Sequence, residues 1–154
     1  MRISVSSDMD EPVARFLLAE LRGRGHDVLL HGALRAGDDP RWAVCSAAAA
    51  REVASGVSDQ AVVCCWTGTG ASIAANKVTG VRAALCTDAY TADGARRWND
   101  ANVLAIGLRL TSEPLLKEIL DAWFGAEASQ DPDDRENVAR VERLDVSRGT
   151  GRTG

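Results

Sequence analysis

The 154-residue sequence lacks the features that define several large classes of protein. No apolar run approaches the ~20 residues that a transmembrane helix needs, which excludes a membrane-spanning protein. The four cysteines show no Cys-x-x-Cys spacing and sit in apolar segments, which excludes a disulfide framework and a zinc finger. The formal net charge is only −4, with a pI near 5.2, and this argues against nucleic acid as a partner.

A secretory leader is also not expected, because residues 1–5 run directly into a strand-like pattern. Together with the unpaired cysteines, this predicts a cytoplasmic protein with reduced thiols, no metal site and no membrane association. Hydrophobic residues make up 45% of the chain and charged residues 26%, as in ordinary globular proteins. The length predicts one domain that buries about two-thirds of its unfolded surface.

Short apolar, β-prone runs alternate with longer helical patterns in the first 125 residues. The expected strands are residues 3–6, 28–31, 60–65, 81–86 and 103–107. The expected helices are residues 12–24, 42–55, 72–78, 91–98 and 112–124. Because the strands are apolar on both faces, this order predicts a parallel sheet with helices on both sides.

The composition changes after Gly125, where residues 129–134 (SQDPDD) form an acidic, turn-rich linker. Residues 135–144 then have helical spacing. The predicted division is a domain over residues 1–125, a linker and helix over 126–146, and a disordered tail over 147–154. A final helix behind a polar linker either reaches across a partner subunit or docks loosely on its own domain.

The segment of residues 64–77 (CCWTGTGASIAANK) joins an expected strand, a glycine-rich turn and a helix. In an open parallel sheet, ligands bind beyond the carboxyl ends of the strands. Gly68 and Gly70 let backbone N–H groups face a ligand, and the helix near Ser72 adds the positive end of its dipole. This turn predicts a nest for a phosphate or a developing enolate oxygen. The alternative is an ordinary tight turn, because neither nucleotide-binding glycine pattern is complete.

Cys65 ends this strand at the mouth of the nest, where backbone N–H groups would stabilise a thiolate. Cys64 points to the opposite face by strand alternation, and we predict that it is a core residue. Cys45 and Cys86 are also predicted to be core residues. Most cysteines in apolar strands are inert, and this alternative stays open for Cys65.

The stretch from Cys65 to Arg109 (CWTGTGASIAANKVTGVRAALCTDAYTADGARRWNDANVLAIGLR) resembles the ribose-5-phosphate isomerase B and galactose-6-phosphate isomerase subunit family. The pattern of that family is approximately CGTGxGxSIAANKxxGIRAA, followed by YTAxxARxHNDANVLxxGxR. Ser7-Asp8 also falls where the family has Ser-Asp-His at the end of its first strand. The resemblance implies an aldose–ketose isomerase of phosphorylated sugars that works through a cis-enediolate, with no metal or organic cofactor.

The resemblance also implies a Rossmann-like three-layer αβα fold with a five-stranded parallel sheet. The C-terminal helix would reach a partner subunit in a homodimer or tetramer whose sites are built from two subunits. In this resemblance Cys65 matches the base that moves the proton between C1 and C2, and Arg109 matches a contact to the substrate phosphate. Arg140, or in its place Arg135 or Arg143, matches the arginine that enters the neighbouring site. The remaining expected site residues are Thr67, Asn99, Gly68, Gly70, Ser72, Asp8 and Trp98.

Departures from the family pattern bear on the substrate. The family's His-Asn-Asp reads Trp98-Asn99-Asp100, so the histidine that helps to open the sugar ring is missing. Its Ser-Asp-His reads Ser7-Asp8-Met9, its Tyr-Pro loop reads Asp38-Asp39-Pro40, and Trp66 replaces a glycine. A retained base without a ring-opening group predicts an open-chain substrate, such as a tetrose or tetrulose phosphate that cannot close a furanose ring.

The two histidines of the chain do not clearly replace the missing ones. His26 is expected to be exposed, and His31 is either structural or reaches the cleft. Two alternatives stay open, a non-catalytic sugar-phosphate-binding relative and one subunit of a hetero-oligomeric isomerase. The retained Cys65 and Arg109 argue against both. A nucleotide-binding module would need an acidic residue at the end of the second strand, where His31 stands.

Overall fold

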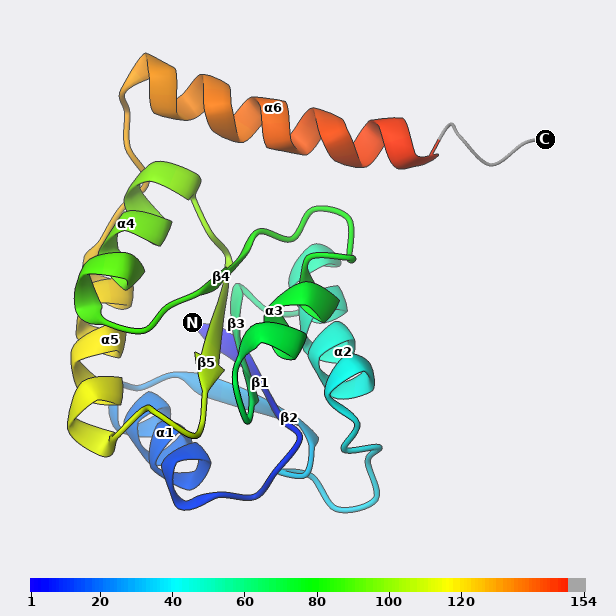
Figure 1. Cartoon of the computed structure of the whole chain (residues 1–154), viewed down its shortest axis with the longest axis vertical. Coiled ribbons are helices and arrows are strands. Elements are labelled where there is room, and N and C mark those ends of the chain that lie inside the picture. Colours follow the sequence, from blue (N-terminus) through cyan, green and yellow to red (C-terminus); the bar gives the residue numbers. More distant parts are fainter. Residues whose placement is uncertain (150–154) are drawn as a thin grey trace.

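The computed structural model describes residues 1–149, and in this part of the chain a parallel five-stranded sheet lies between two layers of helices (Figure 1). The strands are β1 (Arg2–Ser7), β2 (Asp27–Gly32), β3 (Gln60–Cys65), β4 (Ala83–Leu85) and β5 (Val103–Gly107). The helices are α1 (Pro12–Gly23), α2 (Trp42–Ala54), α3 (Thr69–Ala75), α4 (Ala89–Asn99), α5 (Glu113–Gly125) and α6 (Pro132–Gly149). The strand order is β2-β1-β3-β5-β4, which confirms the predicted three-layer α/β fold.

The two faces of the sheet carry side chains of different size. Helices α1, α4 and α5 cover one face, and α2 and α3 cover the other (Figure 1). On the α1–α4–α5 face, Leu104 and Ile106 pack with Trp123, whose indole N–H donates to Gln60 Oε1 at 2.7 Å. The other face is built largely from alanine and valine. The small side chains let α2 and α3 approach the sheet closely.

Before α6, three elements differ from their expected ranges by two or more residues at one end. α3 begins at Thr69, three residues early, because Gly68 takes a left-handed conformation and starts the helix directly after the turn. α4 begins at Ala89 because the Asp88 carboxylate accepts a hydrogen bond from the Thr91 N–H at 2.7 Å. The edge strand β4 is also shorter than the expected 81–86 at both ends, with three residues.

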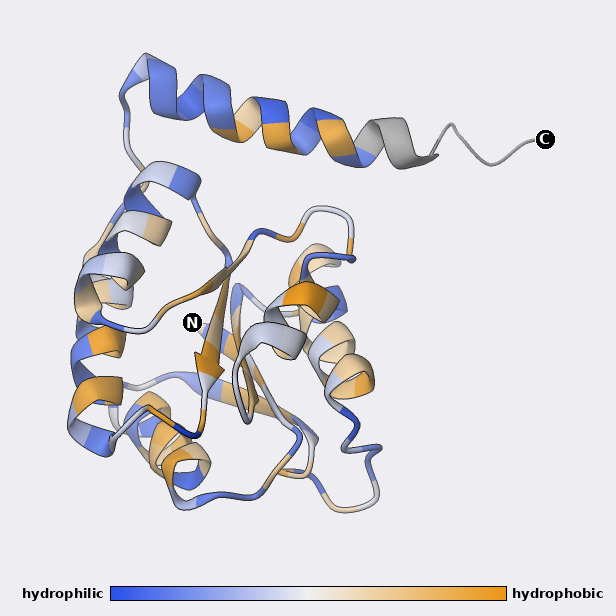
Figure 2. Cartoon of the chain, in the orientation of Figure 1, coloured by the Kyte–Doolittle hydropathy of each residue, from blue (hydrophilic) through white to orange (hydrophobic). Residues whose placement is uncertain are grey.

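The last helix, α6, lies over α4 at the end of the sheet where the strands begin (Figure 1). Glu142 pairs with Arg82 at 3.2 Å, and the Asp145 carboxylate accepts a hydrogen bond from the Gly80 N–H at 2.8 Å. Most of the helix is hydrophilic (Figure 2). The helix expected over residues 135–144 extends over Pro132–Gly149, so residues 147–149 of the predicted disordered tail are helical, and residues 150–154 lie outside the described part. Within residues 1–149 no helix has the length and hydrophobicity to cross a bilayer.

Candidate active site

The candidate site lies at the carboxyl ends of the three central strands. Cys65 ends β3 and is paired with Gly107, which ends β5. On the other side Ser7, the last residue of β1, is paired with Cys64, and Asp8 follows directly. The loops after β1, β3 and β5 therefore start side by side, as expected for a ligand site in an open parallel sheet.

The glycine turn after β3 is fixed by a close backbone contact with β5. Gly68 has a φ of +76°, and a Cβ atom there would lie 2.8 Å from the Gly107 nitrogen. A Cβ atom on Gly107 would in turn lie 2.7 Å from the Thr67 carbonyl oxygen. The Thr67 and Thr69 hydroxyls are hydrogen-bonded at 2.7 Å. Side chains are thus excluded from both glycine positions, and the backbone of the turn is held against the end of β5.

Cys65 lies inside this turn and is almost fully buried, with 4% of its surface exposed. The Gly68 N–H donates a hydrogen bond to the Cys65 Sγ at 3.2 Å. A backbone N–H aimed at the sulfur is the type of contact that stabilises a thiolate. Gly70 and Ser72 lie in the first turn of α3, where Gly70 packs against the Trp42 indole. The expected anion nest and the expected cysteine therefore occupy the same place.

Asp8 brings an acid into the same edge of the sheet. Its Oδ1 atom is buried and accepts no hydrogen bond from any described residue. Burial raises the pKa of the Asp8 carboxyl above its ordinary value, because removal from water disfavours the ionised form. A buried carboxyl oxygen without a hydrogen-bond partner in the described part of the chain therefore lies just beyond the carboxyl end of β1.

Arg109 provides positive charge near the nest. Its backbone N–H donates to the Trp66 carbonyl oxygen at 3.0 Å, which holds the loop after β5 against the turn after β3. A hollow of about 280 Å³ is lined by both residues together with Thr67 and Leu110. Within residues 1–149 the Arg109 guanidinium has neither an ion-pair partner nor a side-chain hydrogen-bond partner. Its donors are thus available to a phosphate group.

Trp98 and Asn99 lie at the opposite edge of the sheet from Cys65 in the same chain. They end α4, just before Asn102, whose carbonyl oxygen accepts from the Ala61 N–H at the start of β3. The four steps along the strand from Ala61 to Cys65 span about 13 Å. The chain therefore does not bring Asn99 and Trp98 to its own Cys65.

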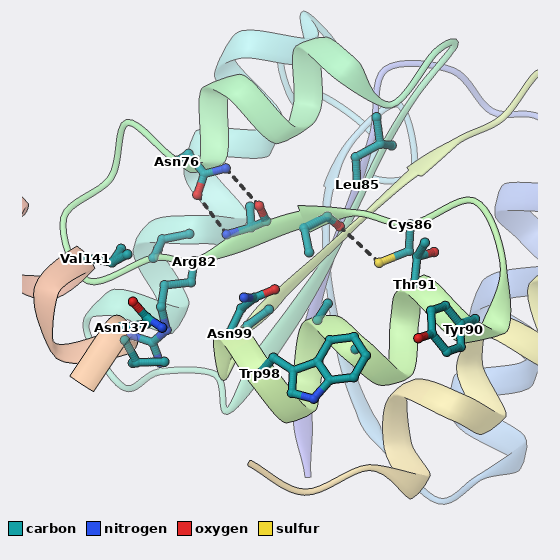
Figure 3. Close-up of a pocket in the computed structure, with 17 residues that line it drawn as sticks. Asn76, Arg82, Leu85, Cys86, Tyr90, Thr91, Trp98, Asn99, Asn137 and Val141 are labelled. Atoms are coloured by element: carbon teal, nitrogen blue, oxygen red, sulfur yellow. Dashed lines mark hydrogen bonds between the residues drawn. The ribbon is translucent and has the colours of Figure 1, made fainter. Parts of the chain in front are cut away.

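Both residues line a larger hollow of about 580 Å³ between β4, α4 and α6 (Figure 3). The C-terminal arginines lie at the same end of the molecule. Arg140 and Arg143 both pair with Glu136, at 3.0 and 2.9 Å, and Arg140 is exposed. None of the three predicted C-terminal arginines therefore reaches the Cys65 turn of its own chain.

Both histidines contact other side chains of the domain. His31 is buried, and its Nε2 atom lies 2.9 Å from Glu52 Oε2, which also accepts from the Ser4 hydroxyl. The expectation that His26 is exposed was wrong, because it is half-buried and its ring packs on Phe124 with centroids 4.7 Å apart. Neither contact shows in the local sequence, since the partners lie far along the chain.

Comparison with known proteins agrees with this geometry. The profile of the family described as Ribose/Galactose Isomerase matches residues 3–144. The galactose-6-phosphate isomerase subunit LacB of Clostridium acetobutylicum is 36% identical over 94% of this chain and 83% of its own. The D-erythrulose-4-phosphate isomerase of Pectobacterium atrosepticum is 41% identical over 59% of this chain and 60% of its own.

A solved structure is similar over nearly the whole fold. The ribose-5-phosphate isomerase B of Clostridium thermocellum superposes with a TM-score of 0.87 at 34% identity, and the match covers 96% of this chain and 99% of the other. The sequence match and the structural match both extend beyond the Cys65 turn, into the C-terminal helix. The chain therefore belongs to the ribose/galactose isomerase family.

Proposed function

We propose that the protein is an aldose–ketose isomerase of phosphorylated sugars with Cys65 as its base. The contact that supports this most directly is the hydrogen bond from the Gly68 N–H to the Cys65 Sγ, inside a glycine turn at the carboxyl edge of the sheet. Proton transfer between adjacent carbons needs one positioned base, donors for an oxyanion and little water. The buried turn supplies all three.

In the proposed reaction the Cys65 thiolate removes the proton from the carbon next to the substrate carbonyl. The C–H electron pair forms the carbon–carbon double bond, and the carbonyl electrons move to oxygen to give an enediolate. Thr67 and the N–H groups of the turn then stabilise the negative oxygen. The Cys65 thiol returns its proton to the former carbonyl carbon, while the neighbouring hydroxyl proton moves to the first oxygen. Atoms and charge balance without a cofactor.

The phosphate of the substrate would serve as a binding handle. Arg109 offers unpartnered guanidinium donors in the hollow beside the turn. Asp8 would accept a hydrogen bond from a sugar hydroxyl through its unpartnered Oδ1 atom. Contacts to these remote groups keep the reacting carbons at Cys65, so that binding energy is used at the reaction centre.

We further propose that each site is completed by a second copy of the chain, in a homodimer or tetramer. Asn99 and Trp98 lie about the length of β3 away from Cys65 in the same chain, and Arg140 lies on α6, which supports a site completed by a second copy. Trp98 and Asn99 face the open 580 Å³ hollow, and α6 is exposed over most of its length. In this arrangement residues 126–146 form the arm between subunits.

The substrate that best fits the site is an open-chain four-carbon sugar phosphate. Neither histidine is placed to open a ring, because His31 is held by Glu52 and His26 packs on Phe124. A tetrulose with phosphate on its terminal oxygen has no hydroxyl left to close a five-membered ring. The similarity to a D-erythrulose-4-phosphate isomerase supports the same chain length.

Proton exchange at the substrate carbon tests this proposal. The protein is incubated in D₂O with D-erythrulose 4-phosphate, D-ribose 5-phosphate and a hexose 6-phosphate, and NMR follows deuterium uptake and aldose–ketose conversion. We expect exchange and conversion with the tetrulose phosphate, and none with the Cys65→Ala variant. Efficient turnover of ribose 5-phosphate alone would refute the proposal that the substrate has four carbons. No exchange from folded protein with any sugar would instead support a binding protein or a partner-dependent subunit.

A further inference from the structure

The Trp98 side chain rests in a notch on its own helix. Tyr90, Gly94 and Trp98 are spaced four residues apart, so they lie along one face of α4. A Cβ atom on Gly94 would lie 2.5 Å from Cζ3 and 2.7 Å from Cε3 of the Trp98 indole. Helical side chains lean toward the helix N-terminus, which directs this indole toward residue 94. The six-membered ring of Trp98 therefore occupies the space that a Cβ would fill.

Tyr90 also contacts the Trp98 indole. Its ring meets the indole edge-on, with centroids 6.0 Å apart and an interplanar angle of 69°. Figure 3 shows both rings on α4 at the wall of the 580 Å³ hollow, with Asn99 beside Trp98. Trp98 remains 44% exposed, so the outer face of a firmly seated indole is available to a ligand.

Gly94 itself needs an explanation. It is buried in the middle of α4, where glycine is less favourable than alanine because it loses more backbone freedom on folding. Gly94 does not have a positive φ, so its backbone conformation does not require glycine. The contact with the Trp98 indole accounts for the glycine, since alanine would push the indole outward by about 1 Å to reach ordinary van der Waals separation.

We propose that Gly94 determines substrate specificity by seating the Trp98 indole as a rigid apolar wall beside the Asn99 amide. This inference rests on the proposed function, in which Asn99 and Trp98 face the substrate in a neighbouring subunit. A wall held in the notch leaves room for a short open-chain sugar phosphate and carries no group that opens a ring. An indole displaced outward would intrude on the space for the substrate, and such a shift is enough to cost 10- to 100-fold in rate.

The test is a double-mutant cycle between Gly94→Ala and Trp98→Phe. Phenylalanine keeps an apolar ring but lacks the outer carbons that contact Gly94. With D-erythrulose 4-phosphate, we expect Gly94→Ala to lower kcat/KM about 10- to 100-fold when Trp98 is present. We expect it to cost less than about 3-fold when Phe is present, because the clash is gone. Gly23→Ala is the matched control, since nothing lies within 4 Å of a Cβ at that helical glycine.

Two further measurements separate the possible failures. Circular dichroism verifies that Gly94→Ala is folded, and Tyr90→Leu loosens the same seat without a clash and should change the ratio of kcat/KM between tetrulose and pentose phosphates. In ¹⁵N NMR, Gly94→Ala should shift the indole N–H signal of Trp98 but not that of buried Trp123. Equal losses in both Trp98 backgrounds, or no loss in either, would overturn the role of Gly94 while wild-type turnover upholds the isomerase. Absence of wild-type turnover would overturn both proposals.

Discussion

Cys64 and Cys65 are neighbours in the chain, but their side chains belong to hydrophobic clusters on opposite faces of the sheet. Cys64 packs on the side of α1, α4 and α5, where burial raises the pKa of its thiol and keeps it neutral. Cys65 lies on the side of α2 and α3, where its sulfur accepts the hydrogen bond from Gly68. Strand alternation thus separates an inert thiol from the candidate base.

This separation predicts different outcomes for two matched variants. Cys65→Ala and Cys64→Ala each remove one buried sulfur, and each should lower the free energy of unfolding by about 1 kcal/mol. Only Cys65→Ala should lose turnover, by about 10²- to 10⁴-fold, because it alone removes the base. Steady-state kinetics and urea unfolding of both variants measure this. Equal activity of the two variants would place the base elsewhere, with Asp8 the next residue to examine.

A second prediction concerns the stability cost of Asp8. Burial raises the pKa of Asp8 above its ordinary value of 3.8, so the folded protein holds this proton more tightly than the unfolded chain does. The ionised carboxylate therefore destabilises the fold at pH values above the raised pKa, and the penalty disappears in acid below pH 3.8. Asp8→Asn should raise the free energy of unfolding at pH 7 by less than about 1 kcal/mol, while lowering turnover.

Urea unfolding at pH 7 and near pH 3.5 measures this effect, and Asp10→Asn is the control. The Arg15 guanidinium holds the pKa of Asp10 below its ordinary value, so removal of that charge should not stabilise the protein at pH 7. A stability gain from Asp8→Asn that persists unchanged in acid would show that burial of the charge is not the cause.

Arg109 is predicted to bind the phosphate of the substrate. Arg109→Ala should lower kcat/KM about 10- to 100-fold, mainly through a higher KM, because it removes charge-assisted hydrogen bonds to the phosphate. Arg109→Lys should restore part of the loss, since lysine keeps the charge but not the planar donors. Arg22→Ala, at the exposed end of α1, is the control. If Arg109→Ala equally impaired turnover of unphosphorylated erythrulose, the phosphate contact would be wrong.

The sequence predicted the central part of the fold well, for a physical reason. β3 and β5 have the expected bounds because a strand buried on both faces is a continuous apolar run between polar turns. The start of α3 was placed too late because a left-handed Gly68 lets a helix begin inside a segment that reads as a turn. The local sequence pattern therefore predicts the bounds of a buried strand, but it does not predict where a left-handed glycine lets a helix begin.

The arrangement around α6 and Trp98 depends on contacts that periodicity does not contain. The pairs Glu142–Arg82 and Asp145–Gly80 join residues about sixty positions apart, and they place α6 on its own domain. The motif predicted Asn99 as a site residue, but its distance from Cys65 within one chain follows from the three-dimensional fold and not from the motif. The contact between Gly94 and the Trp98 indole likewise depends on the side-chain conformation of Trp98, which the sequence pattern does not contain.

A shared site predicts that two inactive variants restore each other. Cys65→Ala keeps an intact Asn99, and Asn99→Ala keeps an intact Cys65. When subunits mix at random in a dimer, half of the dimers are mixed, and each mixed dimer contains one site with both residues intact. About one quarter of the wild-type activity should therefore return. The measurement is turnover after the two proteins are unfolded together in urea and refolded.

The matched control mixes Cys65→Ala with Thr67→Ala. Cys65 and Thr67 belong to the same turn of one chain, so every mixed site lacks at least one of them and no activity beyond that of the separate variants should return. Recovery with Asn99→Ala but not with Thr67→Ala assigns Asn99 to the site of the neighbouring subunit. Recovery with neither would mean that Asn99 does not complete the site of a second copy, since within one chain the length of β3 separates it from Cys65.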